Sequence, residues 1–139
     1  PYIETCDKIH AQTNVAYGMF PNFITPTDTS GYPAILFWPK GLKETEFEWT
    51  QLAPKWSGDE KPDYWNEQEV SFDAIMDEDF QNLEPMQRSH DSGVFESMPL
   101  NYQERRIYYY HQVIDDWIGR DNLPENIQVP NVLDPFIEA

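Results

Sequence analysis

The segment WNEQEVSFDAIMDEDFQNLEPMQRSH, residues 65–90, has the pattern of one long amphipathic helix. At about 100° per residue, its apolar side chains fall on a single stripe. They are Trp65, Phe72, Ile75, Met76, Phe80, Leu83 and Met86. Asp79 falls near the middle of this stripe, and a carboxylate is costly to bury unless another group pairs with it, bonds to it or binds through it. We therefore expect Asp79 to face inward and to be either a satisfied buried acid or a functional one.

Upstream of this helix, short apolar and alternating runs predict an antiparallel sheet. Residues 13–20 alternate in polarity, residues 33–38 (PAILFW) are apolar, and residues 45–52 alternate apolar with polar positions. Residues 2–10 are β-prone, and residues 25–31 (TPTDTSG) have the composition of a turn. Strands with one polar face are typical of antiparallel sheets. We expect three or four strands joined as a meander, with an apolar face that needs a cover.

Downstream, a second helix is predicted over residues 102–118. Asn101 and Glu104 resemble a capping box at its start, and Gly119 is placed to end it. Its apolar stripe contains Ile107, Tyr110, Ile114, Trp117 and Ile118. Strands followed by helices give an α+β class, in which an antiparallel sheet is covered by the long helix. Pro85 predicts either a kink in the long helix or two helices that meet near Glu84.

The chain has 139 residues, which predicts a single domain over residues 1–139. Within it we expect a β meander over residues 1–53, helices over residues 62–119 and an extended tail over residues 120–139. The first residue is Pro rather than Met, which is consistent with a piece of a longer protein.

The composition excludes several classes of partner and site. The net charge of -16 disfavours binding to nucleic acid and to anionic membranes. No apolar run reaches the length of about 18 residues that crosses a bilayer. Cys6 is the only cysteine, so no disulfide within the chain and no cysteine-based metal cluster is expected. A cytoplasmic protein is predicted.

Candidate site residues have both structural and functional interpretations. Asp79 is either paired with Arg88, Arg105 or a tyrosine hydroxyl, or it is a metal ligand or catalytic acid. On an unbroken helix His90 would lie about 16 Å further along the axis, too far to share a metal with Asp79. His111 lies on the apolar stripe of the last helix, where a hydrogen-bonded core histidine is expected rather than a ligand. A complete metal site is therefore not visible in the sequence.

Several segments resemble one family in the same order along the chain. Residues 77–93, DEDFQNLEPMQRSHDSG, resemble the Glu-Asp helix with a following Gln in the large (alpha) subunit of Rieske-type ring-hydroxylating oxygenases. Phe20-Pro21-Asn22 resembles the end of a strand in that family, and residues 38–46 resemble one of its hairpins. Residues 104–119, ERRIYYYHQVIDDWIG, resemble its terminal helix. Together these matches cover most of residues 1–119.

The resemblance implies a helix-grip, START-like catalytic domain that holds mononuclear Fe(II) by two histidines and one carboxylate. Carried over by position, the carboxylate is Asp79, and Gln87 matches the family's glutamine. Ser89 stands where a glycine is common. The family's closely spaced histidine pair and its Rieske [2Fe-2S] ligands are missing, so the fold is expected to be incomplete. The chain then corresponds to the C-terminal portion of the catalytic domain, and the [2Fe-2S] centre is expected only in a missing N-terminal domain.

The resemblance further implies hydroxylation of a small apolar or aromatic substrate with O₂ and electrons from the Rieske centre, and a homo-oligomer that is trimeric by family habit. By itself the chain is expected to be inactive. The alternative is a stand-alone helix-grip module that binds an apolar small molecule between sheet and helix without catalysis. A third class is a structural or assembly partner of a complete oxygenase subunit.

Overall fold

The computed structural model describes residues 5–27, 31–95 and 97–132. The chain divides into two compact units, Pro1–Val94 and Phe95–Ala139. The predicted single domain stays a prediction. Among the described residues, no helix is both long and apolar enough to cross a membrane.

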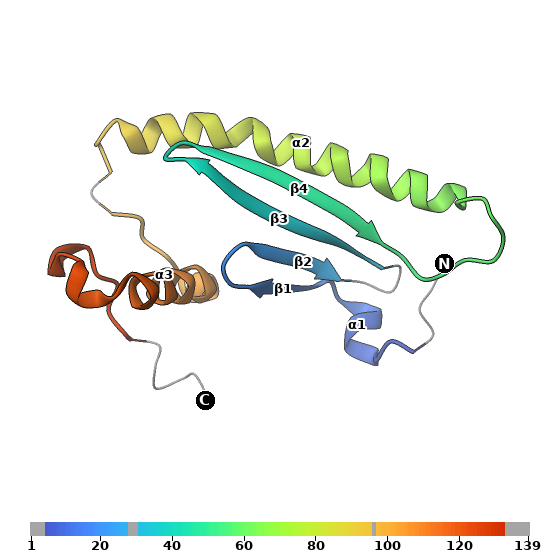
Figure 1. Cartoon of the computed structure of the whole chain (residues 1–139), viewed down its shortest axis with the longest axis horizontal. Helices are drawn as coiled ribbons and strands as arrows, with labels where there is room; N and C mark the ends of the chain where they lie inside the picture. Colours follow the sequence, from blue (N-terminus) through green and yellow to red (C-terminus); the bar gives the residue numbers. More distant parts are fainter. Residues whose placement is uncertain (1–4, 28–30, 96, 133–139) are drawn as a thin grey trace. The chain divides into compact units, whose positions relative to one another are not determined.

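An antiparallel meander forms the sheet of the first unit. Its strands, in chain order and in spatial order, are β1 (Val15–Met19), β2 (Phe23–Thr27), β3 (Tyr32–Gly41) and β4 (Glu44–Leu52). The long helix α2 (Asp63–Asp91) runs along this sheet, and the short helix α1 (Lys8–Gln12) precedes β1 (Figure 1). The predicted α+β class, an antiparallel sheet with a long helix, is confirmed.

Strand β2 was missed by the sequence prediction. Residues 25–31 have the composition of a turn, yet residues 25–27 pair with β1, and Phe23 and Ile24 pair with β3. Pairing on both sides makes β2 a strand, because strand formation depends more on cross-strand neighbours than on intrinsic propensity. Residues 28–30, the rest of the predicted turn, lie outside the described residues.

Helix α1 replaces the end of the β-prone run predicted over residues 2–10. The carboxylate of Asp7 accepts the backbone N–H of His10 at 2.9 Å and caps this helix. A capping carboxylate at the start of a short segment favours helix over strand. Residues 2–4 of the predicted run lie outside the described residues.

Helix α2 packs on the sheet through aromatic pairs. Trp49 and Phe72 have ring centroids 4.5 Å apart, and Phe47 meets Phe80 edge-on at 4.8 Å. The helix is unbroken from Asp63 to Asp91 with Pro85 inside it, so the alternative of two helices is wrong. Residues 81–91 are all exposed, and a helix can absorb the lost hydrogen bond of a proline where water reaches its backbone.

The N-terminal end of α2 is held where Gly31 passes close to Leu52 and to the Trp65 ring. Trp65 is 2% exposed, and the φ of Gly31 is +129°. A Cβ at residue 31 would lie 2.5 Å from the carbonyl oxygen of Leu52 and 3.4 Å from the Trp65 ring. Only glycine combines this backbone conformation with this lack of space.

The second unit begins with the predicted capping box. The Asn101 side chain accepts the N–H of Gln103, and the Glu104 carboxylate accepts the N–H of Asn101, both at 2.8 Å. The helix α3 (Arg105–Ile118) follows and ends at Gly119, whose φ is +87°. The predicted second helix, its cap and its termination are confirmed.

The orientation of α3 differs from the prediction. Its buried residues are polar, Gln112 and Asp115, whereas Trp117 on the predicted apolar stripe is 78% exposed. His111 is exposed, so the prediction of a core histidine is wrong. The polar side of α3 is covered because residues 128–130 return along it.

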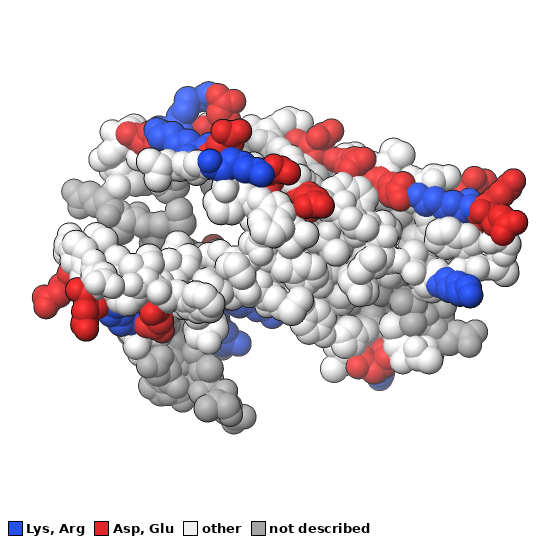
Figure 2. Space-filling model, viewed as in Figure 1, with Lys and Arg blue, Asp and Glu red and all other residues white. Residues whose placement is uncertain are grey.

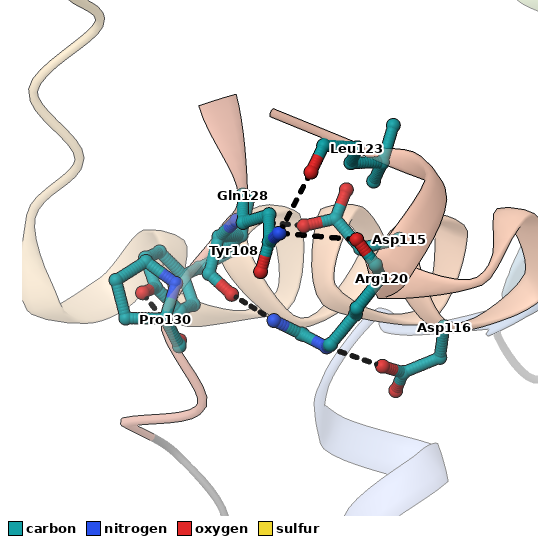
Figure 3. Close-up of polar contacts among 8 residues, drawn as sticks. Tyr108, Asp115, Asp116, Arg120, Leu123, Gln128 and Pro130 are labelled. Carbon is teal, nitrogen blue, oxygen red and sulfur yellow. Dashed lines mark hydrogen bonds and ion pairs between the residues drawn. The ribbon is translucent and has the colours of Figure 1, made fainter. Parts of the chain in front are cut away.

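Hydrogen bonds hold the segment after α3 against that helix (Figure 3). The Asp115 carboxylate accepts the N–H of Val129 at 2.6 Å, and the Tyr108 hydroxyl donates to the carbonyl of Pro130 at 2.6 Å. The Arg120 guanidinium donates to the carbonyl of Val129 at 2.8 Å. Two short 3-10 helices, Arg120–Asn122 and Glu125–Ile127, lie in the region predicted as an extended tail.

Candidate functional site

The structure corrects the orientation predicted for Asp79, because its side chain is exposed. The half-buried positions of α2 repeat at Phe72, Met76 and Phe80, which is the side that meets the sheet. Asp79 precedes Phe80 by one residue and therefore projects about 100° away from it around the helix axis. The burial argument for Asp79 is wrong, whereas its predicted role as a metal ligand stays a prediction.

Asp79 stands on a flank of α2 that is apolar and open to solvent. Ile75 lies four residues before it, and Leu83 and Met86 lie four and seven residues after it, spacings that share one side of a helix. These three side chains are 51%, 53% and 53% exposed. We call Ile75, Asp79, Leu83 and Met86 the Asp79 flank.

Several other acidic residues of α2 lie on its solvent-exposed side. Figure 2 shows Asp and Glu side chains gathered along this helix, at the top of the view. Asp77 and Glu78 are exposed, in agreement with the predicted solvated positions. Arg88, one predicted partner of Asp79, forms an ion pair with Glu84 instead.

A groove of about 290 Å³ opens between α2 and the sheet beside the Asp79 flank. Its apolar lining includes Pro26, Pro33, Phe72, Ile75 and Met76, and its polar lining includes Asn14, Gln51, Gln68 and Ser71. Ile75 belongs both to the groove and to the Asp79 flank, so the carboxylate of Asp79 lies about one helical turn beyond the groove lining. A mostly apolar wall with a few polar groups suits a small apolar molecule.

A second, more open groove lies along the side of α2 nearest β4. It is lined by Trp49, Thr50, Gln51, Glu69 and Asp73. The Trp49 indole N–H donates to the Asp73 carboxylate at 3.1 Å, and Glu69 forms an ion pair with Lys61. Because its carboxylates already have partners within the chain, this groove is a weaker candidate than the first.

The described residues do not supply a complete metal centre. No group of three His, Cys, Asp or Glu side chains is close enough to hold an ion within residues 5–27, 31–95 and 97–132. His90 is eleven residues from Asp79, which is about 16 Å along the helix. A three-ligand iron site therefore does not fit the described part of the chain, although Asp79 could contribute one oxygen ligand to a site completed elsewhere.

One arrangement was not anticipated from the sequence. The Nδ1 atom of His10 lies 2.9 Å from the Asp7 carboxylate, and its Nε2 atom lies 2.7 Å from the Tyr17 hydroxyl. The hydrogen bonds that Asp7 accepts from the backbone and the side chain of His10 lower the pKa of the Asp7 carboxyl. These bonds join α1 to β1, and no spacing rule identifies them because the two elements meet only in the folded chain.

An ion pair and a hydrogen bond meet at Asp91, at the C-terminal end of α2. The Lys43 ammonium, at the β3–β4 turn, lies 2.5 Å from the Asp91 carboxylate, and the Gln87 amide donates to the same group at 3.0 Å. The hydrogen bond from Lys43, followed by that from Gln87, lowers the pKa of Asp91. The turn thus holds the helix end, and the Asp79 flank lies between this contact and the groove.

Comparison with known proteins gives one match. A family model described as the ring hydroxylating alpha subunit (catalytic domain) matches residues 2–120. No curated protein and no solved structure matches the chain.

Proposed function

Because this chain belongs to the family of ring-hydroxylating alpha subunits, within their catalytic domain, we propose that it supplies one wall and one ligand of a mononuclear iron site. The family is one of non-haem iron oxygenases. The proposed reaction is hydroxylation of a small, aromatic or otherwise apolar substrate with O₂. Electrons would come from a Rieske [2Fe-2S] centre carried outside this chain, in a cytoplasmic homo-oligomer.

The observation that carries the proposal is the placement of Asp79 beside the groove. The chain offers one carboxylate on an otherwise apolar flank, about one turn beyond Ile75 in the groove lining. Exposed apolar side chains on both sides of a carboxylate are costly to leave in water, which favours a flank that another part of the protein covers. Two histidines from that covering part would complete the ligand set.

Each group of the chain then has a limited task. Iron, when bound, activates O₂ and leaves positions open for it. The Asp79 carboxylate contributes a negative oxygen ligand, and Ile75 and Met76 present apolar surface to the substrate. Gln51 and Gln68 place amide groups in the same groove and can orient a polar substituent.

The metal role is tested by measuring iron in the alpha subunit that contains this chain. Asp79→Asn should lower bound iron per protomer at least about tenfold, since loss of one anionic ligand removes charge and a coordinating oxygen. Glu78→Gln is the matched control, because residue 78 is also an exposed acid on α2 and should leave iron content unchanged. Equal iron content in Asp79→Asn and the parent would remove the proposed role.

The groove also favours a second candidate, a module that binds an apolar molecule without catalysis. Its test is binding of naphthalene to the iron-free chain, compared with the Ile75→Arg variant, whose side chain would fill the groove. Val70→Arg is the control, because Val70 is 70% exposed and is absent from the groove lining. Naphthalene binding that Ile75→Arg abolishes, together with iron content insensitive to Asp79→Asn, would favour the binding module over the oxygenase.

A further inference from the structure

The sheet of the first unit has a second face, opposite α2. Side chains that pair across neighbouring strands point to the same face, and successive residues alternate. Phe47 and Trp49 contact α2. The alternate residues of β4, Glu46 and Glu48, and the β3 residues that pair with them therefore face the other way. We call this second face the open face. Its residues include Tyr17, Met19, Phe23, Leu36, Trp38, Glu46 and Glu48.

One end of the open face already carries a helix. The imidazole of His10 in α1 stacks on the Tyr17 ring with centroids 6.2 Å apart, and Thr25 beside Tyr17 is only 7% exposed. At the other end, Met19 is 59% exposed and Trp38 is 42% exposed. The open face therefore meets α1 near Tyr17 and presents exposed apolar side chains at its other end.

Strand β4 adds an acidic border to this apolar area. Glu44, Glu46 and Glu48 alternate along β4 and are exposed, and Lys40 pairs with Glu46 at 2.6 Å. The Trp38 indole N–H donates to the Glu48 carboxylate at 3.1 Å, so acid and apolar surface adjoin directly. Three carboxylates against one ammonium leave this border negative.

We propose that the end of the open face at Met19 and Trp38 binds an amphipathic helix of a partner protein whose apolar stripe is bordered on one side by Lys or Arg. Met19, Phe23, Leu36 and Trp38 would receive the apolar stripe, as in helix-in-groove recognition. The β4 glutamates would fix the direction and identity of the partner, since charge complementarity gives specificity and encounter rate more than affinity.

The test uses two synthetic 18-residue helical peptides and the full chain. Both peptides have the same leucine stripe, but one has lysines and the other has glutamates along one border. We expect the lysine peptide to bind about five- to tenfold more tightly at low salt, with the difference shrinking as salt screens the charges. NMR shifts should concentrate on the Met19 methyl group and the Trp38 indole.

A net charge of -16 attracts any basic peptide, so the variants must separate local from general attraction. Glu46→Lys/Glu48→Lys should reverse the preference between the two peptides. Asp77→Lys/Glu78→Lys, which changes the net charge equally on exposed positions of α2, should leave the preference in place. The same response to both double variants, or peptide-induced shifts confined to α2, would overturn the proposal.

Discussion

Phe80 and Asp79 are neighbours in the sequence with opposite environments, and their substitution tests the orientation of α2. The Phe80 ring is half-buried and meets Phe47 edge-on at 4.8 Å. Truncation of a fully buried Phe to Ala costs about 3–5 kcal/mol. Because Phe80 is only partly buried, we expect Phe80→Ala to lower the free energy of unfolding by about 2 kcal/mol.

Asp79→Ala should change the same free energy by less than about 0.5 kcal/mol, as for other surface substitutions away from special contacts. The assay is urea unfolding of the full chain, followed by far-UV circular dichroism and by tryptophan fluorescence. Leu83→Ala is a control for apolar truncation on α2, because Leu83 is 53% exposed. A larger loss for Asp79→Ala than for Phe80→Ala would refute the orientation and restore the inward-facing carboxylate.

Three further predictions concern the contacts that fix the chain. Lys43→Gln should raise the pKa of Asp91, measured by carboxyl carbon NMR. Because the pKa of Asp91 is lowered in the folded chain, its contact with Lys43 stabilises the fold at neutral pH. This stabilisation is lost as the pH falls through the pKa of Asp91. Gly31→Ala should lower the unfolding free energy by about 1–3 kcal/mol, because φ is +129° and the new Cβ would lie 2.5 Å from a carbonyl oxygen of β4. Asp115→Ala should speed hydrogen exchange of the Val129 amide at least about tenfold, since it removes a charge-assisted acceptor at 2.6 Å. Unchanged exchange would contradict the hydrogen bond between Asp115 and Val129.

Local sequence patterns predicted the elements that are specified by apolar spacing, cap residues or strand alternation. The helix over residues 65–90 was expected from apolar spacing, and the capping box at Asn101 and the stop at Gly119 were expected from cap chemistry. The alternation around Phe47 predicted β4 and the side of it that is covered. In each case the physical determinant lies within a few residues of the element it specifies.

The failures come from contacts between distant segments. Strand β2 exists because two strands pair with it, although its residues have turn composition. The polar side of α3 is buried because Val129 and Pro130 return to it, which periodicity alone cannot predict. The spacing of apolar residues shows how wide the apolar stripe of a helix is. It does not show which part of that stripe the sheet will cover.

The sequence alone determined the α+β class, the long helix and a resemblance that the family match over residues 2–120 supports. Only the tertiary structure decided that Phe80 meets the sheet while Asp79 stands on an open flank beside the groove. The reason is geometric: a helix contacts a twisted sheet along a line narrower than its apolar stripe. Side chains only about 100° apart on the helix therefore end in different environments, and the proposed iron site depends on that difference.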